Sequence, residues 1–323
     1  MRHDANVQAG SQADPRLAAT MQQLLRQFLR PIGDRLAHLL AIRLVLTALD
    51  LVQAILIHRH TKLGLRLSEL GGYLLGPEHA PAGTKRISNL LHAPGWRADA
   101  IRAVVWSQTD ARVRELQTAG AEGLVVWDGS VWASQASADW CVVCSAKARR
   151  LARRRNGLTC PPSGPPILVP GLHWEGMLVL GMTGAPTGAD LVWWTTHGPH
   201  ATTQAAVNQQ LLAHAATAWG ADVRHIWNRG YGGSPWIQTA LTAGGPVVVR
   251  WKKGVTLRDT WGDAHKAWEI ARGKRSHGSR MLRAPQTKQL IKVGIVPIPV
   301  TLVDHPHPLW LVVARLGGGR EPW

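Results

Sequence analysis

Two polar residues directly follow predicted strands, and glycines come soon after each of them. Asp128 comes after the apolar run Leu124–Trp127, and Asn228 comes after the run Val223–Trp227. In an α/β sheet, ligands bind beyond the carboxyl ends of the strands, so a carboxylate in this place is well positioned to hold a divalent cation. Two-metal phosphoryl transfer needs several such carboxylates, from separate segments, around ions about 4 Å apart. Both residues also have an ordinary interpretation as turn residues, because Asp-Gly is common in turns and Asn tolerates the left-handed conformation.

Cationic side chains are frequent near the same segments. The run from Lys147 to Arg155 is rich in them, and such a run forms either a solvated charged face or a surface that meets phosphate groups. Arg250, Lys252 and Lys253 follow another predicted strand end. The residues that we expect to contact phosphate are Lys147, Arg149, Arg150, Arg153, Arg154, Arg155, Arg229, Arg250, Lys252 and Lys253.

The whole chain is strongly basic. Its 323 residues include 37 Lys and Arg against 20 Asp and Glu, which gives a formal net charge of +17. Nucleic acid is the usual partner of so basic a protein, and the alternative is a compositional bias of the genome toward Arg, Ala and Gly codons. A hydrophobic content of 45% indicates a globular protein rather than a disordered one.

No segment has the pattern of a secretory signal or a membrane span. The N-terminus lacks an apolar core after its basic start. The longest apolar stretch, Ile42–Ile57, contains Arg43 and Asp50 and is shorter than a span, so we expect a buried helix there. Three cysteines without a framework pattern favour a reducing compartment, the cytoplasm.

The elements that must position these residues change in character at Gly123. From Pro15 to about Gly120 the apolar periodicity is helical. The expected helices are one that ends at Pro31, one over 32–57, a short one capped by Ser68, one over 84–92 and one over 98–118. Basic residues at helix starts, such as Lys85 and Arg86, are compatible with DNA binding, although short basic helices are common.

After Gly123 the pattern alternates between strands and helices. The expected strands are 124–127, 141–144, 177–181, 191–195, 223–227 and 246–250. Helices are expected over 202–219 and from Ser234 to Gly244, and this alternation predicts a sheet with parallel pairs. Residues 254–290 are polar and basic, with no predicted element. Two β-rich runs follow at 291–303 and 309–316, with His305 and His307 in the turn between them.

An ordered set of segments resembles one known family. The segments are VVWDGSV, SAKARRLARRRNG, VPGLHWEGMLVLG, LVWWTTHG, IWNRGYGGSPWIQTAL and VVVRWKKG. In order and spacing they are similar to the DDE-type insertion-sequence transposases, which have a ribonuclease-H-like core. The similarity covers about residues 30–323 and is strongest over 123–253.

The resemblance implies roles for particular residues. In that family the first strand ends in a catalytic Asp, which matches Asp128 and makes it a ligand of Mg²⁺. The fourth strand ends in a second Asp followed by Arg-Gly-Tyr, and Asn228 stands at that position. The third carboxylate is a Glu on a later helix, within a signature of spaced Tyr, Arg, Glu and Lys. Residues 254–323 resemble the β-rich insertion that precedes this helix, so the sequence is expected to end before it.

These observations predict an α/β fold: a ribonuclease-H-like mixed sheet core with a helical N-terminal domain and a β-rich insertion, truncated at the C-terminus. The expected domains are a disordered lead (1–14), a helical DNA-binding domain (15–120), the ribonuclease-H-like core (121–253) and the β-rich insertion (254–323). Asn keeps an oxygen ligand but lacks the negative charge that Mg²⁺ prefers. We therefore expect a catalytically impaired protein of DNA transposition.

Three functional hypotheses follow from the resemblance and from the cysteines. The first is an impaired transposase that would cleave and join DNA at element ends. The second is a non-catalytic protein that binds these ends and regulates a full-length transposase. The expected partners are the DNA of the element ends and of the target, and either a second copy of the chain or a full-length transposase. No membrane partner is expected. The expected location is the bacterial cytoplasm, in association with the nucleoid. The third is a zinc-dependent regulatory module built on Cys141, Cys144 and Cys160, with His173 as a further ligand.

Overall fold

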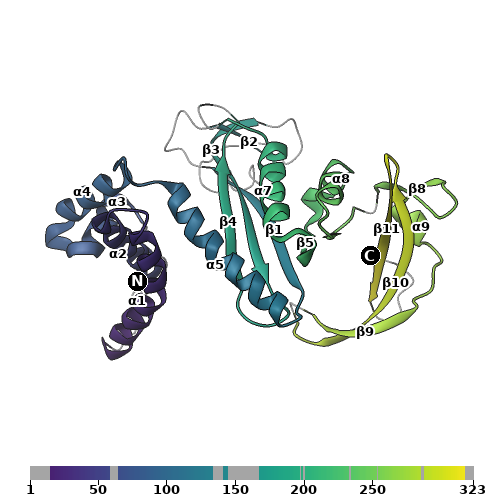
Figure 1. Cartoon of the computed structure of the whole chain (residues 1–323), viewed down its shortest axis with the longest axis horizontal. Helices are drawn as coiled ribbons and strands as arrows, with labels where there is room; N and C mark the ends of the chain where they lie inside the picture. Colours follow the sequence, from purple (N-terminus) through teal and green to yellow (C-terminus); the bar gives the residue numbers. More distant parts are fainter. Residues whose placement is uncertain are drawn as a thin grey trace, which may run out of the picture. The chain divides into compact units, whose positions relative to one another are not determined.

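The computed structural model of the chain (Figure 1) consists of two compact units, Met1–Gln108 and Thr109–Trp323. The boundary between them falls within one helix, and each unit is described by itself. The structure describes residues 15–58, 65–133, 141–144, 167–196, 198, 201–232, 234–252, 254–284 and 287–316. The predicted lead over 1–14 lies outside these residues.

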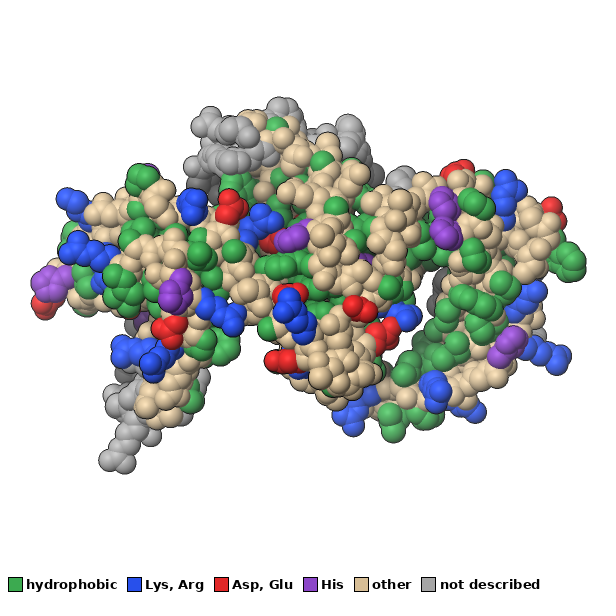
Figure 2. Space-filling model, in the orientation of Figure 1, with side chains coloured by type: hydrophobic (Ala, Val, Ile, Leu, Met, Phe, Trp, Pro, Cys, Tyr) green, Lys and Arg blue, Asp and Glu red, His purple; other side chains and the backbone are tan. Residues whose placement is uncertain are grey.

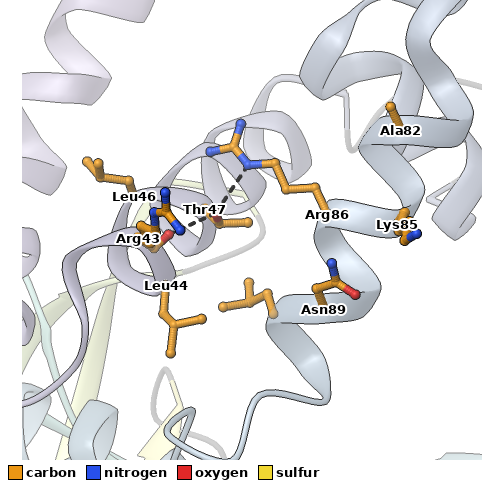
Figure 3. Close-up of a pocket in the computed structure, with 9 residues that line it drawn as sticks. Arg43, Leu44, Leu46, Thr47, Ala82, Lys85, Arg86 and Asn89 are labelled. Carbon is orange, nitrogen blue, oxygen red and sulfur yellow. Dashed lines mark hydrogen bonds between the residues drawn. The ribbon is translucent and has the colours of Figure 1, made fainter.

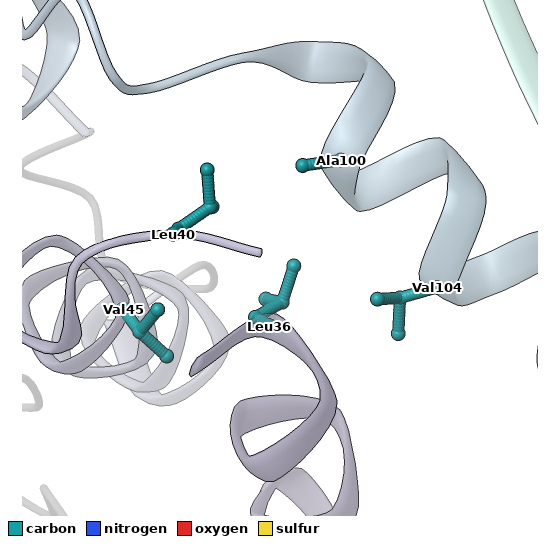
Figure 4. Close-up of a cluster of buried hydrophobic side chains, with 5 residues drawn as sticks. All are labelled: Leu36, Leu40, Val45, Ala100 and Val104. Atoms are coloured by element: carbon teal, nitrogen blue, oxygen red, sulfur yellow. The ribbon is translucent and has the colours of Figure 1, made fainter. Parts of the chain in front are cut away.

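The first unit is helical, as the periodicity predicts. Its elements are α1 (Pro15–Ala37), α2 (Ile42–His58), α3 (Leu67–Leu75), the 3₁₀ turn η1 (Pro77–His79), α4 (Ala80–Leu91) and the first half of α5 (Ala98–Thr118). Figure 4 shows the centre of its core, where side chains from three helices and the α1–α2 turn meet. The buried residues of this cluster are Leu36, Leu40, Val45, Ala100 and Val104.

Four expectations for this unit are wrong in detail. The helix expected over 84–92 begins four residues earlier, at Ala80, so Lys85 and Arg86 lie in its middle and not in its first turn. Helix α1 does not end at Pro31 but continues to Ala37, because Pro31 is exposed and water can satisfy the carbonyl that its ring leaves unbonded. The second helix therefore begins ten residues later than expected, at Ile42. Ser68 does not cap α3; Arg66 occupies the N-cap position, and its N–H donates to the carboxylate of Glu69 at 2.9 Å.

The apolar stretch in α2 is helical but only partly buried. Val45, Ala48 and Ala54 are buried, whereas Ile42 and Leu46 are more than half exposed. Over the part of the chain that the structure describes, no helix combines the length and the apolar character needed to cross a membrane.

The second unit contains a mixed sheet whose strand order is β4-β3-β1-β5-β6, with β2 on the end of β3 that extends beyond β4. Strands β1 (Gly123–Ala133), β3 (Ile167–Leu180) and β4 (Thr187–Trp194) are antiparallel neighbours. Strands β5 (Val223–Trp227) and β6 (Val247–Val249) continue the sheet in parallel with β1. The short β2 (Cys141–Cys144) pairs with β3. The predicted α/β class with parallel pairs is confirmed.

Helices connect the parallel strands, as such connections require. Helix α7 (Gln204–Trp219) starts where Thr203 accepts the N–H of Ala206, a favoured N-cap, and the 3₁₀ turn η2 (Gly220–Asp222) leads into β5. After β5 come η3 (Arg229–Tyr231) and α8 (Ser234–Thr242), which precedes β6. The end of α5 also packs here and buries Val113 and Leu116.

A second sheet covers most of the region after residue 254. Its strands follow the order β11-β10-β7-β8, with β9 pairing β10. The elements are β7 (Thr256–Arg258), β8 (Ala264–Lys266), α9 (Ala267–Ala271), β9 (Gly278–Arg283), β10 (Leu290–Leu302) and β11 (His305–Leu316). The β-rich character was expected, but the elements within 254–290 were not. His305 and His307 lie in β11 rather than in the turn, which is formed by Val303 and Asp304.

Candidate functional site

The register of β1 and β5 brings the two sequence-predicted site residues together. The parallel pairing runs from Gly123 opposite Val223 to Val126 opposite Ile226, an offset of 100 residues. If this offset continues, Asp128 and Asn228 stand level at the carboxyl ends of the paired segments. One detail of the prediction is wrong: β1 does not end at Asp128, because its pairing with β3 continues to Ala133.

Asp128 and Asn228 form a hydrogen-bonded pair at the surface. The amide Nδ2 of Asn228 donates to Oδ1 of Asp128 at 3.3 Å. The other end of the amide is also used, since Oδ1 of Asn228 accepts the backbone N–H of Gly230 at 2.7 Å. This second bond orients the amide, because only the oxygen can accept a backbone N–H. Asn228 therefore presents an NH₂ group to the Asp128 carboxylate.

A buried acid that sequence reasoning missed lies on the neighbouring strand. Glu175 of β3 is opposite Gly129 in the register and is 1% exposed. A Cβ on Gly129 would lie 2.6 Å from Oε2 of Glu175, so glycine makes room for the carboxyl. The hydroxyl of Tyr231 donates to Oε1 of Glu175, and the side chain of Gln204 also hydrogen-bonds this carboxyl. A single acid within the apolar run His173–Leu180 was the available signal.

Burial controls the protonation of this carboxyl. Desolvation raises the pKa of Glu175 from 4.5 to about 7, while the hydrogen bonds from Tyr231 and Gln204 act in the opposite direction and the charge of Asp128 adds to the rise. Burial likewise raises the pKa of Tyr231, with the nearby Glu175 charge as the next cause. The tyrosine therefore remains a hydrogen-bond donor, and the glutamate is part protonated near neutral pH.

An aromatic cluster underlies the pair. Trp127, 2% exposed, donates its indole N–H to Nδ1 of the buried His225 at 3.0 Å. Trp127 also meets Trp227 and Tyr231 edge to face, with ring centroids 6.0 and 6.4 Å apart, a favoured geometry. Burial lowers the pKa of His225 to about 4, so its ring is neutral and Nδ1 can accept. This cluster joins the middle of β1 to the end of β5.

The donor set does not fit the Mg²⁺ pair that the resemblance implies. Asn228 turns its nitrogen, not its oxygen, toward Asp128, and a nitrogen that carries two protons is no cation ligand. Side chains alternate along a strand, so Asp128 projects from the face of β1 opposite to Trp127 and Gly129, whereas Glu175 is buried against Gly129. Among the residues that the structure describes at this site, one exposed carboxylate remains, too few to neutralise two hard cations.

Among the described residues, one group of three acid or imidazole side chains is close enough to share a cation: Asp259, Asp263 and His265. Its geometry has an ordinary cause. Asp259 accepts the backbone N–H groups of Trp261 and Asp263 at 2.8 and 3.1 Å, which is the bonding of a tight turn between β7 and β8. We regard this group as structural.

The remaining sequence-predicted residues are placed in part. Arg250 and Lys252 are exposed just after β6. In Figure 2, the Lys and Arg side chains on the face shown are scattered over the surface rather than gathered in one patch. The residues that lie outside the described part of the chain, or whose side chains do, are Lys147, Arg149, Arg150, Arg153, Arg154, Arg155, Arg229 and Lys253.

The predicted zinc ligands are not brought together by any described contact. Cys141 and Cys144 belong to β2, and Cys160 lies outside the described residues. The ring of His173 stacks on Trp194 with centroids 4.0 Å apart, and burial lowers its pKa. The stacking shows that the ring of His173 packs against β4, and we assign it a structural role.

Comparison with known proteins adds no family to this picture. No protein-family model and no curated protein sequence matches the chain. The candidate site is thus defined by its own geometry. A surface Asp–Asn pair lies just beyond the parallel pairing of β1 with β5. A buried aromatic cluster and a buried acid that is part protonated near neutral pH lie next to it.

The raised pKa of Glu175 predicts a stability that falls with pH. The folded protein binds a proton at Glu175 more tightly than the unfolded chain does, so stability is highest below 4.5 and declines as the pH rises through about 7. The decline is about 3 kcal/mol in the free energy of unfolding. The Glu175→Gln variant should lack this decline. We therefore expect the free energy of unfolding of the wild type, relative to that of the variant, to fall between about pH 5 and about pH 8, as measured by urea unfolding.

The control for this experiment is Glu78→Gln, which changes an exposed carboxyl. His225 acts in the opposite sense, because its stability contribution is present above 6.5 and is lost as the pH falls toward about 4. Both proteins contain His225, so subtracting the pH profile of the Glu175→Gln variant from that of the wild type removes the contribution of His225. A difference that stays constant across the pH range would show that Glu175 is not a titrating buried acid.

Proposed function

We propose that this chain is a DNA-binding protein of the DDE transposase type, with a ribonuclease-H-like core whose strand-cleaving centre is not assembled. The observation that carries the proposal is the hydrogen bond between Asn228 and Asp128, just beyond the parallel pairing of β1 with β5. These are the places where the resemblance puts the first two catalytic acids. The order β4-β3-β1-β5-β6 supports it, since β5 is the parallel neighbour of β1.

The charge of the protein supports the partner in this proposal. A formal charge of +17 favours a polyanion, and each cation that meets a phosphate releases a counterion from DNA. Binding of this kind requires no metal ion and no acid at position 228. A protein that holds DNA without cleaving it would compete for element ends with a catalytically complete relative, or would assemble with one.

Duplex DNA binding and strand nicking test the proposal together. We expect binding whose affinity falls steeply with salt, and no nicking above background with Mg²⁺ or Mn²⁺. Asp128→Ala should leave the affinity unchanged. Fluorescence anisotropy at several salt concentrations measures the first result, and relaxation of supercoiled plasmid measures the second.

Two outcomes would contradict the proposal. Metal-dependent nicking that disappears in Asp128→Ala would show a working cleavage centre. Salt-insensitive or absent DNA binding by the wild-type chain would remove the DNA partner altogether.

A further inference from the structure

Helices α3 and α4 approach each other unusually closely. A Cβ on Gly83 of α4 would lie 2.1 Å from the carbonyl oxygen of Gly71 of α3, and a Cβ on Gly71 would lie 2.4 Å from the backbone N of Thr84. No side chain fits at either position, so the two helix backbones are in direct contact. The hydroxyl of Thr84 also donates to the carbonyls of Ala80 and Leu67, which joins the start of α4 to the start of α3.

The connection between these helices is short and begins with a glycine. Gly76 has a φ of +91°, a conformation that side chains rarely adopt. Pro77, Glu78 and His79 complete the four-residue turn before α4. Two helices joined by a turn of three or four residues that often contains glycine form a helix-turn-helix, in which the second helix enters the major groove of DNA.

The two faces of α4 have different roles. Gly83, Ile87 and Leu90 are buried and fix the helix to its unit. The opposite face carries Ala82, Lys85 and Asn89, all exposed. These residues are spaced i, i+3 and i+7, so they form one stripe.

A groove of about 650 Å³ runs between this face of α4 and α2 (Figure 3). It is lined by Arg43, Leu44, Leu46, Thr47, Ala82, Lys85, Arg86, Asn89 and Leu90. Arg86 reaches across to α2, where it donates to Thr47 at 3.2 Å and to Asp50 at 2.9 Å. Within the described residues, Arg43 and Lys85 form no ion pair, so two cations of the groove are uncompensated.

We propose that α3 and α4 form a helix-turn-helix that reads duplex DNA, with Lys85 and Asn89 of α4 in the major groove and Arg43 of α2 on a neighbouring phosphate. This inference rests on the proposed function and names its DNA-reading site. The residue types fit base edges: Lys donates to guanine O6 and N7, Asn pairs with adenine N6 and N7, and an Ala methyl contacts the thymine methyl. Arg86, held by Asp50, fixes the spacing of α4 from α2.

The chemistry of this face favours DNA over an acidic peptide. An acidic peptide would engage the cations, and the amide of Asn89 would bond its backbone, which is the same in every sequence. In duplex DNA both an amide and an ammonium group have defined partners in the major groove, and the guanidinium of Arg43 has a phosphate.

The test is a binding selection with the full chain and a random-sequence duplex library. We expect the wild type to enrich a defined sequence. Lys85→Ala and Asn89→Ala should each bind the enriched duplex about tenfold more weakly, and Arg43→Ala should weaken all duplexes alike and lower the salt slope by about one. Alanine favours helix, so these variants should fold, which circular dichroism melting verifies.

Matched controls remove the same groups elsewhere. Arg26→Ala removes an exposed charge from α1, and Gln27→Ala removes an exposed amide; neither should alter the enriched sequence. Lys85→Ala and Asn89→Ala variants that select and bind as the wild type does would overturn the inference while leaving DNA binding, and so the proposed function, intact. A wild type that binds no duplex would overturn both the inference and the proposed function. If polyglutamate displaces the enriched duplex as effectively as unlabelled duplex does, the face binds polyanions in general, and the inference is wrong.

Discussion

Replacing Asn228 with aspartate should create a cation site at the end of β5, next to Asp128 of β1. Without divalent cations, Asn228→Asp should be less stable than the wild type, because a donor amide 3.3 Å from the Asp128 carboxylate becomes a like charge. Both side chains are exposed, so the repulsion is screened, and the loss is about 1 kcal/mol in the free energy of unfolding. The bond from Gly230 is retained, because a carboxylate oxygen also accepts it.

Divalent cations should reverse this loss. Two carboxylates on adjacent strands give a hard cation the charge that the wild-type pair lacks. A cation at about one hundred times its dissociation constant adds about 2.7 kcal/mol to the free energy of unfolding. Urea unfolding with and without Mn²⁺ measures the change. The wild type and Asn89→Asp, which adds the same charge on α4, should show no response. A wild type stabilised by Mn²⁺ as much as the variant would show that Asn228 already serves as a ligand.

Trp127→Ala should be among the most destabilising single changes in the second unit. Trp127 is 2% exposed and packs against the side chains of His225 and Trp227 of β5. Removing a buried Trp side chain costs about 3–5 kcal/mol. Loss of its N–H leaves Nδ1 of His225 without a donor and adds about 1 kcal/mol. Trp127→Phe, which keeps most of the ring volume, should lose about half as much.

The free energy of unfolding in guanidinium chloride measures these effects. Trp261→Ala is the matched control, because Trp261 is 86% exposed and its loss should change stability by less than about 0.5 kcal/mol. Equal effects of the Trp127 and Trp261 substitutions would mean that the aromatic cluster does not hold the strands together.

Elements with a strong local pattern could be predicted from the sequence alone. Helix α5 and strand β5 have the predicted limits, Ala98–Thr118 and Val223–Trp227. Neither run contains a glycine or a proline, and a glycine stands close outside each, Gly120 after α5 and Gly220 before β5. The α1 prediction fails at Pro31, since the rule that proline ends a helix ignores an exposed position where water satisfies the freed carbonyl. Strands β7, β8 and β9 were missed because they are short and mostly exposed and depend on pairing.

Some residues of the candidate site could be predicted from the sequence, and others could not. Asp128 and Asn228 were found because each directly follows an apolar run of the sequence, and the parallel pairing of β1 with β5 brings these runs side by side. Glu175 could not be predicted to lie near them, because its position depends on the antiparallel register of β1 with β3. That register cannot be read from the sequence of either strand taken alone. The orientation of the Asn228 amide depends on the N–H of Gly230, a tertiary detail that no sequence pattern shows.

The buried indole of Trp127 also has a kinetic consequence. Its N–H proton is bonded to Nδ1 of His225 and shielded from solvent, so it exchanges with deuterium only when β1 and β5 separate. The exchange rate of this one proton, followed by NMR in D₂O, therefore measures how often the end of the sheet opens. The chain has 16 Trp, and Trp219 of α7 is also buried with its N–H bonded to Asp110. Assignment of the Trp127 signal, for example by its loss in Trp127→Phe, is therefore part of the measurement.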